Sequence, residues 1–206
     1  MFALVEDGSI TKYFSGNRGF TLNGNQYSKQ VFTLWSKSER EAIGIYEVEM
    51  DTSKRKDEQW YINTDVSYAF AGGKVTGSYG DATVKPHADT LFTAQDEEDG
   101  LGTEGEVKAE GLKTQLIRKV KQQAAGELQN TDWYIVRKAD AGTAVPSAIT
   151  NHRAAVRTKC AEMETAITNA SNTAAIETLY TFVNTADEGD PVVMERPLGE
   201  LPTLEV

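Results

Sequence analysis

The first part of the chain alternates apolar and polar residues over short stretches, which is the period of a β-strand with one buried face. Three pairs of turn-forming residues separate these stretches: Asp7-Gly8, Asn23-Gly24 and Gly72-Gly73. Such residues reach positive φ at little steric cost, as tight hairpin turns require. Residues 1–84 are therefore predicted to form a domain rich in β-hairpins.

Two further features occur in this region. Ser38 and Glu41 have the spacing of a helix capping box and predict one short helix among the strands. In residues 45–50 acidic side chains alternate with apolar ones, as in a strand with one solvated face. The aromatic residues of the region either form a surface contact or line the core face of the sheet, and their alternation favours the core.

Residues 85–110 differ sharply in composition. Between Asp96 and Glu106 there are six acidic residues, three glycines and no basic residue. Low hydrophobicity and like charge favour a solvated chain, so we expect an acidic, glycine-containing linker.

A calcium-binding loop is the alternative for this acidic segment. Placing Gly100 at the sixth position puts acidic residues at positions 3, 5 and 12 of an EF-hand loop: Glu97, Asp99 and Glu106. Gln95 then stands at the first position, where Asp is expected, and the flanks lack paired amphipathic helices. The linker is the interpretation we favour.

Residues 111–184 have the period of helices. Leu112, Leu116 and Val120 are four residues apart and form an apolar stripe. A second stripe continues over five turns: Ile149, Val156, Cys160, Met163 and Ile167. After a tight polar loop, Thr173 is a candidate cap for a short helix that would extend to Val183, and the long and short helices would form an antiparallel hairpin.

The last segment, residues 185–206, contains three of the five prolines and no helical period. Proline lacks a backbone donor and discourages ladder pairing, so we expect an extended arm. Val193, Met194 and Leu198 alternate with charged residues, which favours packing on the protein's own body or on a neighbouring subunit over a disordered tail.

These segments together predict an α+β fold. Its parts are a β-hairpin-rich N-terminal domain (1–84), an acidic linker (85–110), a helical domain with a helical hairpin (111–184) and an extended Pro-rich C-terminal arm (185–206).

Residues that could carry chemistry are few. The two histidines, His87 and His152, belong to no metal-binding or catalytic array, and Cys160 is alone on an apolar stripe. The glycines of "AGGKVTGS" lack the spacing of a phosphate-binding loop. We therefore expect a protein that is not an enzyme, with no catalytic residues, no cofactor and no bound metal.

The formal net charge of −10 opposes nucleic-acid binding, because such a surface repels phosphate. The basic run at Arg118–Lys121 is better explained as a solvated helix face.

No apolar stretch approaches the roughly 18 residues that span a bilayer, so we expect no membrane insertion. The first residues lack a basic segment and their apolar run ends at Glu6, which indicates no signal peptide and synthesis in a cytoplasm.

The stretch "TDWYIVRKADAGTAVPSAITNHRAAVR" combines a helix start, aromatic residues and two arginines one turn apart. Thr131 and Asp132 suit an N-cap and a first-turn acid. Trp133 would then be a buried anchor on a short helix that folds back on the long helix carrying Arg153 and Arg157. A packing motif is the interpretation we favour, and docking of a partner is the alternative.

The same stretch resembles a C-terminal element of tailed-bacteriophage proteins that are tied to tail fibres and tail assembly. Its pattern is T/S-D-W, an Arg, a Gly-containing turn, Pro, and a helix with R-x-x-x-R. The matching residues are Thr131, Asp132, Trp133, Arg137, Gly142, Pro146, Arg153 and Arg157. The match covers residues 128–160, and the whole chain is loosely similar to structural proteins of marine phages.

The resemblance implies a virion structural protein of a tail, tail fibre or baseplate, made in the host cytoplasm. Its partners would be other tail proteins and further copies of itself. A tail-assembly chaperone and a receptor- or glycan-binding module are the alternatives. The residues expected to make contacts are Trp133, Arg137, Pro146, Arg153, Arg157, Val193, Met194 and Leu198.

Overall fold

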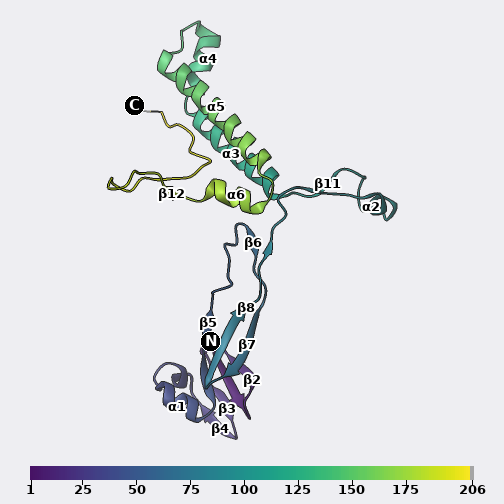
Figure 1. The fold of residues 1–206 in the computed structure, drawn as a ribbon, viewed down its shortest axis with the longest axis vertical. Helices are drawn as coiled ribbons and strands as arrows, with labels where there is room; N and C mark the ends of the chain where they lie inside the picture. The colour runs from purple at the N-terminus through teal and green to yellow at the C-terminus, as the bar shows by residue number, and fades with distance from the viewer. Residues whose placement is uncertain (205–206) are drawn as a thin grey trace. The chain divides into compact units, whose positions relative to one another are not determined.

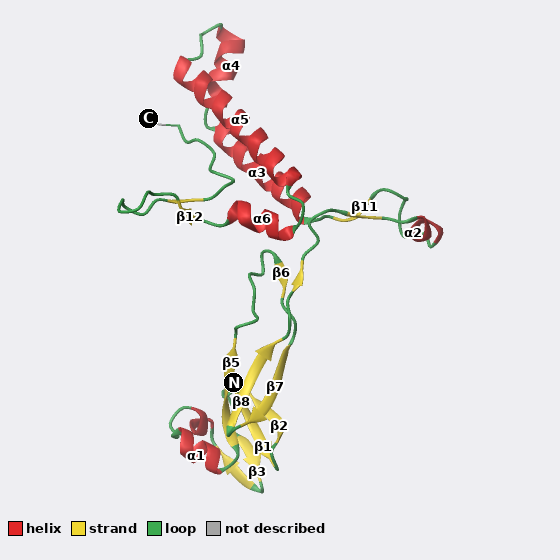
Figure 2. Ribbon diagram, viewed as in Figure 1, coloured by secondary structure: helices red, strands yellow, loops and turns green. Residues whose placement is uncertain are grey.

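The structure, a computed structural model, describes residues 1–204. The chain divides after Thr83 into two compact units, and each is described by itself below. The first unit is built on a β-sheet and the second on helices, so the fold class is α+β, as predicted (Figure 2).

A five-stranded sheet in the order β2-β1-β5-β8-β7 forms the body of the first unit (Figure 1). Its strands are β1 (Phe2–Glu6), β2 (Ser9–Phe14), β5 (Ile45–Asp51), β7 (Val66–Ala71) and β8 (Lys74–Tyr79). Neighbouring strands are antiparallel except β5 and β8, which run parallel. Two smaller strands, β6 (Tyr61–Ile62) and β9 (Thr83–Val84), lie outside this sheet.

The three predicted hairpin turns are confirmed. Asp7-Gly8 joins β1 to β2, Asn23-Gly24 joins β3 (Phe20–Leu22) to β4 (Asn25–Tyr27), and Gly72-Gly73 joins β7 to β8. Both residues of each pair have positive φ, between 49° and 80°. This conformation matches the twist of the flanking strands.

A hydrophobic cluster rich in phenylalanine fills the core of this unit. Four of its members are buried: Phe2, Leu4, Phe32 and Ile45. Phe14 and Phe20 pack against them, with ring centroids 4.7 Å apart, and Phe32 is supplied by the short helix η1 (Lys29–Phe32). These four phenylalanines thus line a core, as the alternation predicted, whereas Tyr13 is exposed.

The predicted short helix is present as α1 (Lys37–Ala42), but its cap was placed wrongly. The capping box consists of Ser36 and Glu39 rather than Ser38 and Glu41. Ser36 N–H donates to the Glu39 carboxylate at 2.7 Å, and Ser36 Oγ accepts from Glu39 N–H at 3.3 Å. The two pairs have the same spacing, so spacing alone could not distinguish them.

Two long antiparallel helices, α3 (Leu112–Gln129) and α5 (Ser147–Asn169), form the body of the second unit (Figure 1). Lys113 Nζ, at the start of α3, donates to the carbonyl of Thr168, at the end of α5. The predicted apolar residues of both helices are buried: Leu112, Leu116, Val120, Ile149, Val156, Cys160, Met163 and Ile167.

The pairing of the helices differs from the prediction. The antiparallel partner of α5 is α3, and the short helix α4 (Asp132–Ala141) connects them. The last helix, α6 (Thr173–Tyr180), is capped by Asn172, whose side chain accepts from Ala175 N–H, rather than by Thr173. It ends before Val183, which belongs to a strand.

The acidic segment 85–110 is exposed, as expected, but it has regular structure that the linker prediction lacked. Strands β10 (Thr90–Leu91) and β11 (Val107–Ala109) pair, and the helix α2 (Ala94–Glu98), which connects them in sequence, lies at the far end of the pair (Figure 2). A capping box between Thr93 and Asp96 starts α2. Local hydrogen bonds therefore order a segment whose composition favours solvation.

The C-terminal segment has two parts. Strand β12 (Val183–Asn184) pairs with β13 (Met194–Glu195) in a short hairpin, although the prolines were expected to discourage such pairing. Pro191 lies in the loop between them, where no ladder donor is needed. Beyond it, Leu198 is 2% exposed and its N–H donates to the carbonyl of Leu179. Packing on the protein's own body thus holds for Leu198; residues 205–206 of the predicted arm lie outside the described residues.

Candidate interaction site

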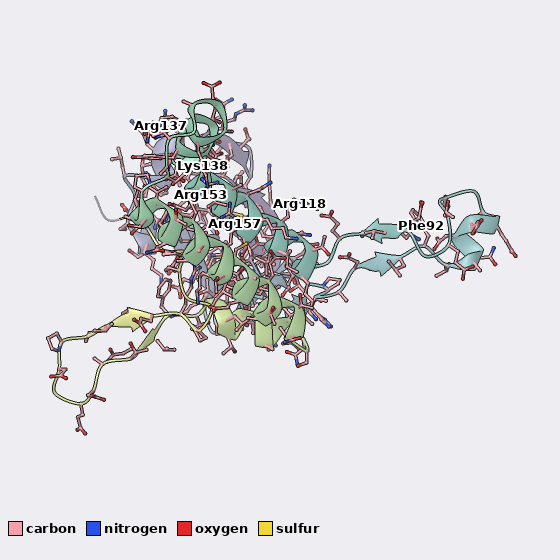
Figure 3. The ribbon with its side chains drawn as sticks, turned by 90° about the horizontal axis from the view of Figure 1, so that it is seen from above. Phe92, Arg118, Arg137, Lys138, Arg153 and Arg157 are labelled. Carbon is pink, nitrogen blue, oxygen red and sulfur yellow. The ribbon has the colours of Figure 1, made fainter. Side chains whose placement is uncertain are left out.

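A buried arginine fixes the start of α4. Arg153, on α5, is 7% exposed, and its Nη1 donates to the carbonyl of Leu128 at 2.7 Å and to Thr131 Oγ1 at 2.6 Å. The same nitrogen lies 2.9 Å from Oδ1 of Asp132. One guanidinium therefore joins the end of α3, the turn and the first residue of α4. Arg153 is labelled in Figure 3.

Thr131 accepts a hydrogen bond from Arg153 and does not cap the helix through its side chain. It occupies the N-cap position of α4, but its side chain makes no capping hydrogen bond. Its hydroxyl donates to the carbonyl of Leu128 at 2.9 Å and accepts from Arg153, and the residue is 1% exposed. The predicted N-cap role is wrong because the hydroxyl is already engaged on the side of α5.

Trp133 is exposed, and its predicted role as a buried anchor is wrong. Its side chain is 51% exposed, and none of the ten residues of α4 is buried. The helix has no core of its own for the indole to enter. Instead the guanidinium of Arg137 lies 4.6 Å from the centre of the Trp133 ring and 5.5 Å from that of Tyr134.

Arg137 is held in this stack with part of its hydrogen-bonding capacity unused. Its Nε is buried and has no hydrogen-bond partner within residues 1–204. A buried polar atom without a partner costs free energy unless another molecule satisfies it. The side chains of Ile135 and Val136 are also exposed, but on other sides of this helix.

The arrangement suits protein recognition. Tryptophan, tyrosine and arginine are the residues most enriched at energetic hot spots of interfaces, and stacked rings lose little conformational freedom on binding. We call the set Trp133, Tyr134 and Arg137 the α4 surface.

The other residues of the pattern take no part in the Arg153 network or the Trp133 stack. Pro146 lies at the N-cap of α5, and Gly142 ends α4 with φ 68°. Arg157 is exposed, and its Nη1 donates to the carbonyl of Arg153, one turn earlier in its own helix, so it takes no part in the Thr131 network.

The C-terminal candidates separate from one another. Val193 and Met194 are exposed on the β12–β13 hairpin, whereas Leu198 is in the interior and unavailable to a partner. Val192 is exposed beside them, and sequence reasoning missed Phe182 and Val183, which are also exposed on or beside this hairpin. The hairpin could have been suspected from Val183 and Val192–Met194 flanking a Gly-Asp-Pro turn.

Other groups that could hold a ligand are partnered or dispersed. No cluster of three His, Cys, Asp or Glu side chains suited to a metal ion occurs within residues 1–204. In the segment considered for calcium, Asp96 pairs with Lys108 at 2.5 Å and Glu97 accepts from Glu104 N–H at 2.9 Å. Lys108 and the Thr93 backbone and hydroxyl donors lower the pKa of Asp96 to about 2.

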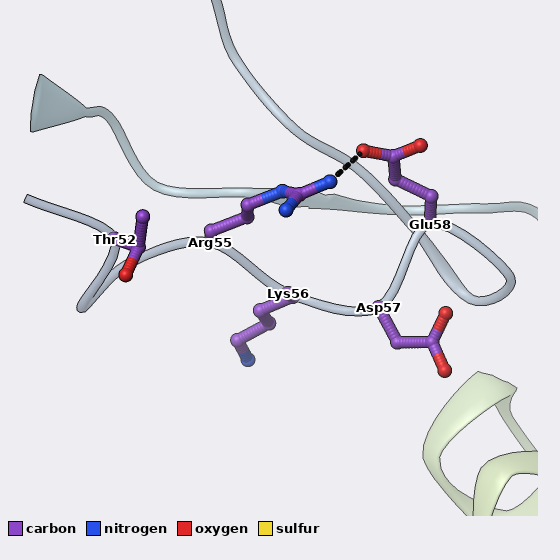
Figure 4. Close-up of a pocket in the computed structure, with 5 residues that line it drawn as sticks. All are labelled: Thr52, Arg55, Lys56, Asp57 and Glu58. Carbon is purple, nitrogen blue, oxygen red and sulfur yellow. Dashed lines mark hydrogen bonds and ion pairs between the residues drawn. The ribbon is translucent and has the colours of Figure 1, made fainter. Parts of the chain in front are cut away.

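A polar pocket of about 540 Å³ lies in the first unit, in the loop after β5 (Figure 4). Its lining residues come from one segment: Thr52, Arg55, Lys56, Asp57 and Glu58. Arg55 and Glu58 form an ion pair at 2.8 Å, which raises the pKa of Arg55.

The single cysteine, Cys160 on α5, is buried. Burial raises the pKa of the Cys160 thiol, so the thiol stays protonated and serves as a small apolar group.

Comparisons with protein-family models, with curated proteins and with solved structures find no match to this chain. Among the described residues, no helix combines the length and the apolar character that crossing a bilayer requires.

Proposed function

We propose that this chain is a structural protein of a bacteriophage tail, as a component of the tail, tail fibre or baseplate. It acts through contacts with other tail proteins and with copies of itself. The observation that supports this most directly is the exposure of the α4 surface on a helix whose start is fixed by Arg153.

The geometry gives a physical interpretation of the pattern that resembles phage tail proteins. Thr131, Asp132 and the first arginine of R-x-x-x-R, Arg153, form one network. Trp133 and Arg137 form one stack that faces solvent. One part of the pattern thus positions a helix and another part is available to a partner, which suits a protein that assembles.

Mass spectrometry of purified particles of the phage that encodes the chain tests the proposal. A structural protein is present at constant stoichiometry in washed particles. Absence from the particles, together with capture on a tail protein in the infected cell, would contradict the proposal and indicate an assembly chaperone instead.

A variant links this test to the α4 surface. Trp133→Ala is expected to lower incorporation into particles by about tenfold or more, since truncating a hot-spot aromatic residue costs 2 kcal/mol or more, roughly a thirtyfold loss of affinity. Lys138→Ala, on the same helix, is the matched control. Normal incorporation of Trp133→Ala would show that α4 is not the contact.

A further inference from the structure

The β12–β13 hairpin exposes an apolar surface with an acidic tip. Exposed apolar side chains lie on or beside its strands: Phe182, Val183, Val192, Val193 and Met194. Its loop contains Asp187, Glu188 and Asp190, for which no ion pair occurs within the described residues. The hairpin extends away from the helices of its unit (Figure 1). Contiguous apolar surface on a protruding element is typical of an interaction site.

One face of α3 has the complementary properties. A shallow groove of about 430 Å³ follows this helix and is lined by Thr114, Ile117, Arg118, Lys121, Gln122 and Ala125. These positions recur every three or four residues, so they share one face of the helix. Ile117 and Ala125 supply apolar surface, and Arg118 and Lys121 supply positive charge.

The charges of the two elements are opposite. Helix α3 has four basic residues and one acidic residue, in a chain with a net charge of −10. Residues 182–195 have four acidic residues and no basic residue. Opposite potentials across a contact steer association and reject wrong partners.

We propose that the β12–β13 hairpin of one copy docks in the α3 groove of a second copy. The apolar side chains of the hairpin cover Ile117 and Ala125, and the carboxylates of its loop meet Arg118 and Lys121. This inference rests on the proposed function as an assembling subunit and names its homotypic contact.

The occupant is a second copy because both complementary surfaces belong to this chain. The β10–β11 arm is also acidic, but Asp96 is already paired with Lys108 there. Arg118 and Lys121 have ion pairs of their own, with Glu110 and Glu164, but these pairs are at the surface and are easily exchanged. Because the two surfaces differ, the contact is heterologous, and repetition builds a ring or a filament.

Charge reversal on each of the two surfaces, in two variants of the full chain, tests the contact. Sedimentation velocity measures the self-association of each variant. The wild-type protein is expected to self-associate with rising concentration, and less so at high salt. Asp187→Lys/Glu188→Lys/Asp190→Lys and Arg118→Glu/Lys121→Glu should each weaken association by at least about tenfold, because like charges then face each other. Mixing the two variants should restore it, since each supplies the surface the other lacks.

Cross-linking in trans tests the position of the contact. In a Cys160→Ala background, a chain with Val192→Cys is mixed with a chain with Gln122→Cys and oxidised. A disulfide-linked heterodimer is expected from this pair, and not when Ala154→Cys on α5 replaces Gln122→Cys. Circular dichroism confirms that each variant is folded.

Three results would overturn the inference. The wild-type protein could remain a monomer at all concentrations, or mixing the two charge variants could fail to restore association. Association could also be unchanged by the hairpin substitutions but be lost in the variant Leu91→Ser/Val107→Ser. The last would assign the groove to the β10–β11 arm. Detection in phage particles is independent of all three, so a monomer found in particles would refute this contact and leave the proposed function standing.

Discussion

Helices α4 and α5 follow one another in the chain and bury their side chains to very different extents. Seven residues of α5 are buried along its 23-residue length, and none of the ten in α4 is. Both carry apolar residues and arginines, so composition does not separate them. The difference is that α5 has α3 beside it, while α4 is fixed mainly through the Arg153 network at its first turn.

This contrast divides stability from recognition. Substitutions along the stripe of α5 should cost folding free energy, and substitutions on the α4 surface should cost binding to partners instead. Three predictions test this division, beginning with the largest effect, and a fourth tests a segment that is ordered without a core.

Ile167→Ala should lower the free energy of unfolding by about 2–5 kcal/mol, because Ile167 is 0% exposed and the substitution leaves a cavity. Chemical denaturation measures the change. Ile135→Ala, the same substitution on α4, should change it by less than about 0.5 kcal/mol. Equal losses of unfolding free energy in the two variants would contradict the contrast between α5 and α4.

Arg153→Met should lower stability by about 1–3 kcal/mol, since it removes the donor to the Leu128 carbonyl and the Thr131 hydroxyl. Hydrogen exchange should also show faster opening of α4. Arg157→Met, one turn further along α5, is the control and should have an effect near zero. If Arg157→Met proved as costly, the assignment of the network to Arg153 would be wrong.

The sequence predicted α5 well because a continuous stripe over five turns requires a continuous partner. It predicted Trp133 poorly for the complementary reason. A tryptophan on a ten-residue helix is buried only if another element covers that helix, and nothing local to Thr131–Ala141 specifies one. The contact between Arg153 and Thr131 depends on the register of α3 against α5, which periodicity does not determine.

The hairpins and the acidic segment show which local features can be predicted from the sequence and which were overlooked. Asp7-Gly8 determines its turn locally, and the prediction from the sequence was right. In residues 85–110 the net charge suggested a featureless linker, although Thr93 and Asp96 had capping-box spacing. There the overall composition concealed a local signal that could have been recognised.

Trp133→Ala tests the comparison at the exposed helix, α4, by measuring how little its tryptophan contributes to folding stability. In the isolated protein the cation–π contact with Arg137 and the ring contact with Tyr134 are lost, so stability should fall by about 0.5–1.5 kcal/mol. Thermal unfolding of the isolated protein gives the value. Trp60→Phe, at a buried tryptophan of the first unit, is the control and should cost more. A loss of 3 kcal/mol or more from Trp133→Ala would mean that the indole is buried after all.

The smallest effect is expected in the arm formed by β10, α2 and β11, which is ordered by exposed polar contacts rather than by a core. Lys108 and Thr93 hold the pKa of Asp96 at about 2, below its ordinary value of 3.8. A lowered folded-state pKa means that the contribution of Asp96 is complete above about pH 4 and is lost as pH falls towards 2. Amide exchange in residues 90–109 should therefore accelerate over that window while α3 and α5 remain protected. Asp96→Asn should remove this pH dependence; if the variant kept it, another carboxyl group would be ordering the arm.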